Sequence, residues 1–213
     1  MKEIMTKEQL FKKFYNLNKS LYQKAKNPLK CHGPDHHLRV YKNADYLAYK
    51  LEAKADWEVL TPAIFLHDIT AFEPHAHDPW NHQEDLGEAK SELRKLKYPN
   101  EKIDRILKVI SVHGSDQKKI KKDEPIEATL LRDADKMDVM GPIGIGRIFM
   151  ALTKSSGFEL KDFAIKYHRE KIIREKWQSI KTKPARDKVF KDYQYSLKFF
   201  KALNKKLEEK QNE

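Results

Sequence analysis

Histidine and carboxylate side chains that could bind a metal ion occur at four separate places in the sequence. They are His36, the adjacent pair His67-Asp68, His113 and Asp135. Imidazole nitrogen and carboxylate oxygen are the donors that borderline and hard divalent cations prefer. No cysteine belongs to this set, which argues against a thiolate-rich structural zinc site. The sequence therefore predicts a divalent metal centre with mixed nitrogen and oxygen ligands.

Each of these places also has a simpler interpretation. The pair His67-Asp68 follows an apolar run that ends at Leu66. Burying both polar side chains costs free energy unless something compensates them. A metal would do so, and a hydrogen-bonded pair at a helix end would do so equally well. Taken alone, His36 and its neighbour His37 are more typical of a solvated histidine pair, and His113 is no more than a structural histidine.

Three aspartates lie among apolar residues in the run Asp133-Ala134-Asp135-Lys136-Met137-Asp138. Asp135 and Asp138 share a helical face, and Asp133 does not. Helix capping and surface charge explain one or two of these residues more easily than all three. The run therefore offers carboxylates that could bind a metal or hold its ligands and helix ends in place.

Apolar residues recur at helical spacing along most of the chain, which predicts an all-α fold. A capping box of Thr6 and Gln9 begins the first helix, and Asp56 can cap the helix that leads to His67. Other helices are expected at 36–54, 83–97, 100–113, 125–133, 159–178 and 184–209, after a first one at 6–26. Loops are expected at 70–82 and 115–124. The glycine-rich run 141–147 is expected to interrupt the helical pattern where helices approach closely.

The length and composition fit one domain with a substantial core. The chain has 213 residues, of which 39% are hydrophobic and 35% are charged. We expect a single domain over residues 1–213, with a core at about 30–153 and C-terminal helices at about 158–209 packed on it.

The formal net charge is +11, and residues 154–213 hold most of it, with 17 basic and nine acidic residues. Such a flank could attract phosphates or nucleic acid, although a solvated helix surface is the simpler explanation. The single cysteine, Cys31, fits a reducing compartment. The sequence has no signal-peptide core and no apolar run that could span a bilayer, so we expect a cytoplasmic protein that does not bind membranes.

In their order and spacing these residues resemble the HD-domain superfamily of metal-dependent phosphohydrolases, whose pattern is H…HD…D. His36 begins the H-x-x-R-V motif, and His67-Asp68 is the HD dyad. Asp135 lies in a run similar to the D-A-D-[RK]-[LM]-D-x-x-G form of a small bacterial branch, and the similarity continues through Arg147. Nucleotide pyrophosphohydrolase activity is proposed for some members of that branch. The resemblance covers about residues 30–209.

The resemblance implies an all-α HD-domain helical bundle with a C-terminal helical extension. It also implies one divalent metal ion held by His36, His67, Asp68 and Asp135. The mixed donors favour Mn²⁺ or Fe²⁺ and are compatible with Mg²⁺, Ni²⁺ or Zn²⁺. The implied reaction is hydrolysis of a phosphoester or phosphoanhydride in a small phosphorylated substrate, with a nucleotide as the first candidate.

The resemblance also suggests roles for individual residues. Asp68 is expected to bind the metal and to orient or deprotonate the attacking water. Lys136, Arg39 and His113 are candidates to bind phosphate or to protonate the leaving oxygen. Arg39 could equally be a partner of an aspartate beside the site. His113, together with His82, could instead bind a second metal, although the adjacent histidine pair of two-metal members is missing.

Some features of better-known relatives are absent. Residues 69–72 lack the acidic pair that follows the dyad in guanosine-tetraphosphate hydrolases, and the GYP signature of the cyclic-dinucleotide branch is missing. A di-iron HD-type oxygenase is an alternative, but it needs more ligands than the four convincing ones. A basic nucleic-acid-binding helical module is another, although no helix-turn-helix or aromatic-basic signature supports it. The sequence does not reveal the oligomeric state.

Overall fold

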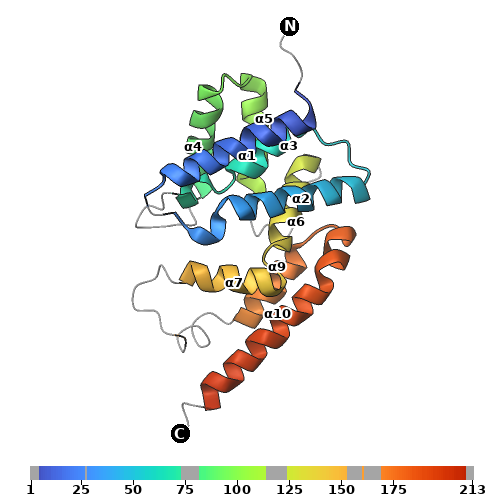
Figure 1. Cartoon of the computed structure of the whole chain (residues 1–213). Coiled ribbons are helices and arrows are strands. Elements are labelled where there is room, and N and C mark those ends of the chain that lie inside the picture. Colours follow the sequence, from blue (N-terminus) through green and yellow to red (C-terminus); the bar gives the residue numbers. More distant parts are fainter. Residues whose placement is uncertain are drawn as a thin grey trace. The chain divides into compact units, whose positions relative to one another are not determined.

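The computed structural model of the chain describes residues 5–26, 28–72, 82–113, 124–152, 160 and 169–209. Within these ranges all regular structure is helical, which confirms the all-α prediction. The elements are α1 (Lys7–Lys24), η1 (Lys30–His32), α2 (Pro34–Lys50), α3 (Trp57–Leu66), η2 (Ile69–Phe72), α4 (His82–Lys95), α5 (Asn100–His113), α6 (Ile126–Met137), α7 (Gly141–Leu152), α9 (Arg169–Ser179) and α10 (Lys183–Glu209) (Figure 1).

The chain divides into two compact units, Met1–Ala134 and Asp135–Glu213. The expected packing of the C-terminal helices on the rest of the chain therefore stays a prediction. The loops expected at 70–82 and 115–124 fall mostly outside the described residues, as does much of the helix expected at 159–178.

Helix α3 forms the centre of the first unit, where it packs against α1, α2 and α5. All eight residues from Val59 to Leu66 are buried, so along this stretch no face of the helix meets solvent. The Asp56 side chain accepts a hydrogen bond from the backbone of Glu58, which confirms the expected cap. A helix that is apolar all round belongs in a core. Its C-terminal end therefore delivers the next two residues, the HD dyad, to the interior.

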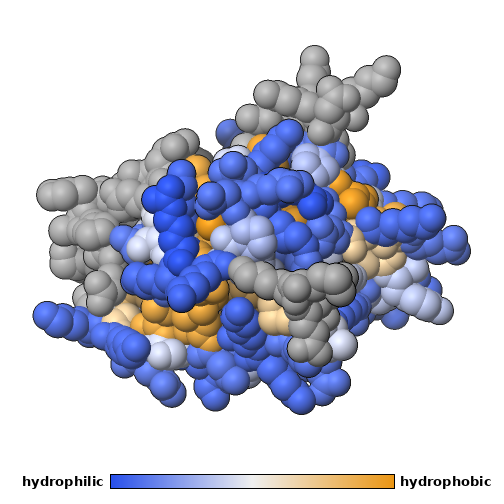
Figure 2. All heavy atoms as spheres, turned by 90° about the horizontal axis from the view of Figure 1, so that it is seen from above, coloured by the Kyte–Doolittle hydropathy of each residue, from blue (hydrophilic) through white to orange (hydrophobic). Residues whose placement is uncertain are grey.

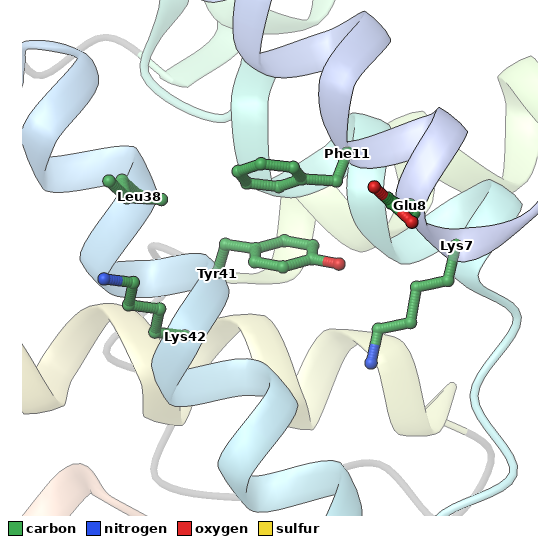
Figure 3. A pocket seen from close by; sticks show the side chains of 6 residues that line it. All are labelled: Lys7, Glu8, Phe11, Leu38, Tyr41 and Lys42. Atoms are coloured by element: carbon green, nitrogen blue, oxygen red, sulfur yellow. The ribbon is translucent and has the colours of Figure 1, made fainter.

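Aromatic rings fill the contact between α1 and α2. Phe11 on α1 lies over Tyr41 on α2, with ring centroids 4.8 Å apart (Figure 3). Tyr41 in turn stacks on Phe65 of α3, at 5.8 Å. The same rings border an open hollow of about 380 Å³, whose lining is Lys7, Glu8, Phe11, Leu38, Tyr41 and Lys42. The aromatic layer ties α2, which carries His36, to the central helix.

In the second unit, α10 packs against α7 and α9. The prediction that residues 141–147 interrupt the helical pattern is wrong, because α7 begins at Gly141. Gly141 has a φ of +72°, and a Cβ there would come within 2.7 Å of Asp192 on α10. The expected close approach of two helices is thus found at this glycine. Gly144 instead packs on the backbone carbonyl of Val139, and Gly146 has no such neighbour.

The face of the molecule seen in Figure 2 is largely polar where it is described. In the view of Figure 2, hydrophilic residues cover most of the coloured surface, with smaller hydrophobic patches between them.

Among the helices described, none combines the length and the apolar character needed to cross a membrane.

Candidate metal centre

His67 and Asp68 lie directly behind the buried helix α3, and both are buried, with exposed fractions of 0% and 8%. His67 is the residue that ends the helix, and its Nδ1 lies 2.8 Å from the carbonyl oxygen of Ile64. Since a carbonyl only accepts, Nδ1 carries the proton in this contact. The lone pair is then on Nε2, which lies 3.3 Å from Asp68 Oδ2. This is the tautomer that a metal ligand needs.

His113, the last residue of α5, is held in the same way. It is 2% exposed, and its Nδ1 lies 2.5 Å from the carbonyl oxygen of Ile110. Its Nε2 lies 3.9 Å from Asp68 Oδ1, and its ring is 4.8 Å from the ring of His67. Two helix ends therefore aim the Nε2 atoms of two histidines at one carboxylate.

The first turn of α2 brings His36 to the same carboxylate. Gly33 precedes the helix, and Pro34, which suits the first helical turn, begins it. His36 is fully buried, with Nε2 3.7 Å from Asp68 Oδ2. His37 is also fully buried, so the simpler interpretation of a solvated histidine pair is wrong. His37 Nδ1 lies 3.1 Å from the carbonyl oxygen of Gly33, and burial, with the nearby rings of His67 and His36, holds its pKa well below 6.5.

His32 is the residue of this cluster that the sequence alone did not reveal. It ends the short 3-10 helix η1, and its Nδ1 lies 2.6 Å from Asp68 Oδ2. The segment 31–35 looked like a turn because it contains Gly33 and Pro34. The signal that could have found His32 is its position just before His36, across the turn of Gly33 and Pro34.

Asp68 is the point on which these side chains converge, and its pKa lies well below the ordinary value of 3.8. Burial acts to raise this pKa. The neighbouring imidazole groups of His67 and His32, together with the hydrogen bond from His32, lower it by more. Asp68 is therefore an ionised carboxylate at neutral pH, as a metal ligand must be.

The end of α5 is fixed by a buried arginine. Arg132 on α6 is 1% exposed, and its Nη2 donates to the carbonyl oxygen of Val112 at 2.8 Å. The same atom lies 2.6 Å from Glu124 Oε1, whose side chain is also buried. Because Val112 precedes His113, the hydrogen bond from Arg132 also fixes the backbone that carries His113.

The first unit thus contains two groups of possible metal ligands that share Asp68. One is His32, His36 and Asp68, and the other is His67, Asp68 and His113. Within each group, the ligand atoms lie within 4.8 Å of one another. Their donors are imidazole nitrogens and one carboxylate, a set that suits a divalent transition metal. These residues fit a metal ion and could hold one.

The other predicted site residues have different positions. Arg39, one turn after His36, donates to Asp35 at 2.7 Å, and so has an aspartate partner. Asp135 and Lys136 lie near the end of α6, just past the boundary between the units, so their part in the site stays a prediction. In the second unit, Asp138 pairs with Arg147 at 3.0 Å.

Two further predictions concern residues that cannot be placed. The His82 side chain and the lysines at 118–122 lie outside the described part of the chain. In the first unit, Asp133 is fully buried, and the role expected for it stays a prediction.

Solved structures share this fold. No family model matches the sequence. A HD-superfamily hydrolase from Bacillus thuringiensis has a TM-score of 0.64 at 20% identity, over 94% of this chain and 98% of that chain. Bacillus subtilis YpgQ, solved in complex with ADP, has a TM-score of 0.63 at 20% identity, over 92% and 97%.

The chain thus has the fold of solved HD-superfamily hydrolases, and within the described residues that fold holds a buried histidine–aspartate cluster. A comparison of sequences identifies the family. The curated protein YpgQ of Bacillus subtilis is 30% identical over 181 residues, which cover 81% of this chain and 84% of YpgQ. The chain belongs to the same family as YpgQ.

Proposed function

We propose that the protein hydrolyses a phosphoester or phosphoanhydride bond of a nucleotide, using one divalent metal ion held by His36, His67, Asp68 and Asp135. The observation that carries the proposal is the convergence of three Nε2 atoms, from His36, His67 and His113, on the Asp68 carboxylate at 3.3–3.9 Å. These distances are long for good hydrogen bonds, and a cation among these atoms would bring them into favourable contact. Asp135 is included on the sequence motif.

A bound divalent ion would lower the pKa of a water ligand and offset the charge of a phosphoryl oxygen. Asp68, ionised and buried, is suited to orient that water and to accept its proton. His113, at the side of Oδ1, is a candidate to contact the phosphate or to protonate the leaving oxygen. Lys136 and Arg39 are candidates to bind the phosphate through their positive charge.

Two features support a nucleotide substrate. The relative YpgQ has been solved in complex with ADP. The formal charge of this chain is +11, which favours association with polyanions. The mixed nitrogen and oxygen donors support Mn²⁺ or Fe²⁺ as the metal. The presence of a single cysteine, the buried Cys31, supports a cytoplasmic location.

The test is a hydrolysis screen with nucleoside triphosphates and diphosphates, in which phosphate and pyrophosphate release are both measured. We expect turnover with Mn²⁺, loss of turnover with chelator, and recovery when Mn²⁺ is added back. The Asp68→Ala variant, with its helical content checked by circular dichroism, is the matched control and should be inactive. Hydrolysis by that variant at the rate of the wild type would contradict the proposed function.

A further inference from the structure

We propose that His32 is a positioning residue of the metal centre, which holds Asp68 by a hydrogen bond from Nδ1 to Oδ2. This inference rests on the proposed function, because it assigns a role within the same site. Its basis is the 2.6 Å contact, the shortest that links any histidine of the cluster to Asp68.

His32 differs from the other histidines in the atom that it presents. His36, His67 and His113 turn Nε2 toward Asp68, at distances of 3.3–3.9 Å. His32 turns Nδ1, at a distance typical of a strong hydrogen bond to a charged acceptor. A carboxylate only accepts hydrogen bonds, so Nδ1 must be the donor. A nitrogen that carries a proton cannot also bind a metal, so His32 does not bind one through Nδ1 while it donates to Asp68.

Main-chain hydrogen bonds fix the positions of His32 and Asp68 relative to each other. Leu29 donates to the carbonyl oxygen of Ala71 at 2.7 Å, just beyond the dyad. Ala71 donates in turn to the carbonyl oxygen of Asp68 at 3.1 Å, and His32 donates to the carbonyl oxygen of Leu29 at 2.9 Å. The turn that carries His32 and the turn that carries Asp68 are thus joined by main-chain hydrogen bonds. This fixed spacing makes the Nδ1–Oδ2 contact a built feature of the site.

As a consequence, the two carboxylate oxygens of Asp68 have different roles. Oδ2 is engaged by His32, and Oδ1 lies toward His113, at 3.9 Å from its Nε2. Holding one oxygen fixes the rotamer of the carboxylate, so less rotational freedom is lost when a metal or water binds. Partners of this kind around metal ligands typically contribute about 10–100-fold to metal affinity or activity.

The experiment compares wild type with His32→Ala, His32→Asn and Lys30→Ala, in the metal-free protein titrated with Mn²⁺ by calorimetry. Asparagine can place its amide N–H near the position of Nδ1, and it keeps the donor without the ring. Lys30 is an exposed residue of the same 3-10 helix and is the matched control. Circular dichroism and thermal unfolding check that each variant is folded.

We expect the Mn²⁺ affinity of His32→Ala to fall about 10–100-fold. That of His32→Asn should stay within about threefold of wild type, and Lys30→Ala should be unchanged. In hydrolysis the Ala variant should lose kcat with little change in KM, and the Asn variant should recover most of it. Unchanged affinity in His32→Ala would overturn the proposal. Equal losses in the Asn and Ala variants would also overturn it, since they would indicate that the ring itself binds the metal.

The calorimetric result separates this inference from the proposed function. A wild-type protein that binds Mn²⁺ but hydrolyses no nucleotide would contradict the proposed function, while the affinities would still decide the role of His32. A wild-type protein that binds no Mn²⁺ would overturn both.

Discussion

Two groups of buried charged residues in the first unit have different architectures. In one, Arg132 is paired with Glu124 and also bonded to the carbonyl oxygen of Val112, at 2.6–2.8 Å. In the other, Asp68 has one short contact, to His32, and three longer ones at 3.3–3.9 Å. The first group joins α6 to the end of α5 by a short hydrogen bond, and to Glu124 by an ion pair. The second assembles ligand atoms around a common point.

The difference separates a structural use of buried charge from a functional one. Removing one partner of a buried ion pair leaves the other charge without compensation, so the cost appears in stability. Side chains arranged to bind a ligand make their best contacts only when the ligand is bound. Substituting one of them should therefore lower ligand affinity and turnover more than stability. Substitutions in the two groups should therefore change different quantities.

The largest expected effect is on activity. Asp68→Asn should lower kcat for the best nucleotide substrate roughly a thousandfold or more, because it removes both a charged ligand and the proposed base. The free energy of unfolding of the metal-free protein should change by only about 1 kcal/mol, since the Asn carbonyl can still accept from His32. Steady-state kinetics and urea unfolding measure the two quantities. A large loss of stability with activity retained would reverse the comparison.

The largest expected effect on stability is at Arg132. Arg132→Leu should lower the free energy of unfolding by about 3–5 kcal/mol, because Glu124 is left buried and unpaired. The double variant Arg132→Leu, Glu124→Leu should recover part of this loss, and denaturant unfolding measures both. If the single variant is as stable as wild type, the ion pair does not have the structural role assigned here.

A smaller effect concerns pH, through His37. Its pKa is lower in the folded protein than in the unfolded chain. As the pH falls below about 6.5, the unfolded chain therefore binds a proton before the folded protein does. The free energy of unfolding should therefore decrease as the pH falls below this value, by up to about 1.4 kcal/mol per pH unit.

The variant His37→Phe should remove this part of the pH dependence. Phenylalanine fits the aromatic surroundings, where Phe65 and Phe72 lie within 6.5 Å of the His37 ring. Urea unfolding at several pH values between 5 and 7.5 should give a shallower slope for the variant, by about one proton. Identical slopes in the two proteins would show that His37 does not supply this pH dependence.

The smallest expected effect is at an exposed ion pair, which serves as the reference for both buried groups. Glu8 and Lys12 lie 2.8 Å apart, with side chains that are 74% and 68% exposed. Glu8→Gln should change the free energy of unfolding by less than about 0.5 kcal/mol and leave kcat unchanged. A loss comparable to that of Arg132→Leu would mean that burial is not what distinguishes these pairs.

The helices and their caps could be predicted from local sequence. The capping box of Thr6 and Gln9 begins α1, and α5 spans the expected residues 100–113. These features depend on residues within one or two turns of each other, so a short stretch of sequence determines them. The run 141–147 was misjudged because three glycines lower helix propensity, whereas tertiary packing at Gly141 favours α7.

The site could be predicted only in part. The dyad and His36 are predicted because their spacing matches a known pattern, and the structure brings these side chains together. His32 was missed because its role depends on a contact with Asp68, 36 residues away in the sequence. The burial of His37 was missed for the same reason, since Phe65 and Phe72 cover it from other elements.

The most direct test of the account is the metal content of the protein. Wild type and His67→Ala would be purified without added metal and analysed for metals, before and after reconstitution with Mn²⁺. We predict about one Mn, Fe or Ni per chain in the wild type, which is the occupancy of a single site, and loss of that metal in the variant. No metal in either protein, even after reconstitution, would contradict the central claim that the histidine–aspartate cluster is a metal centre.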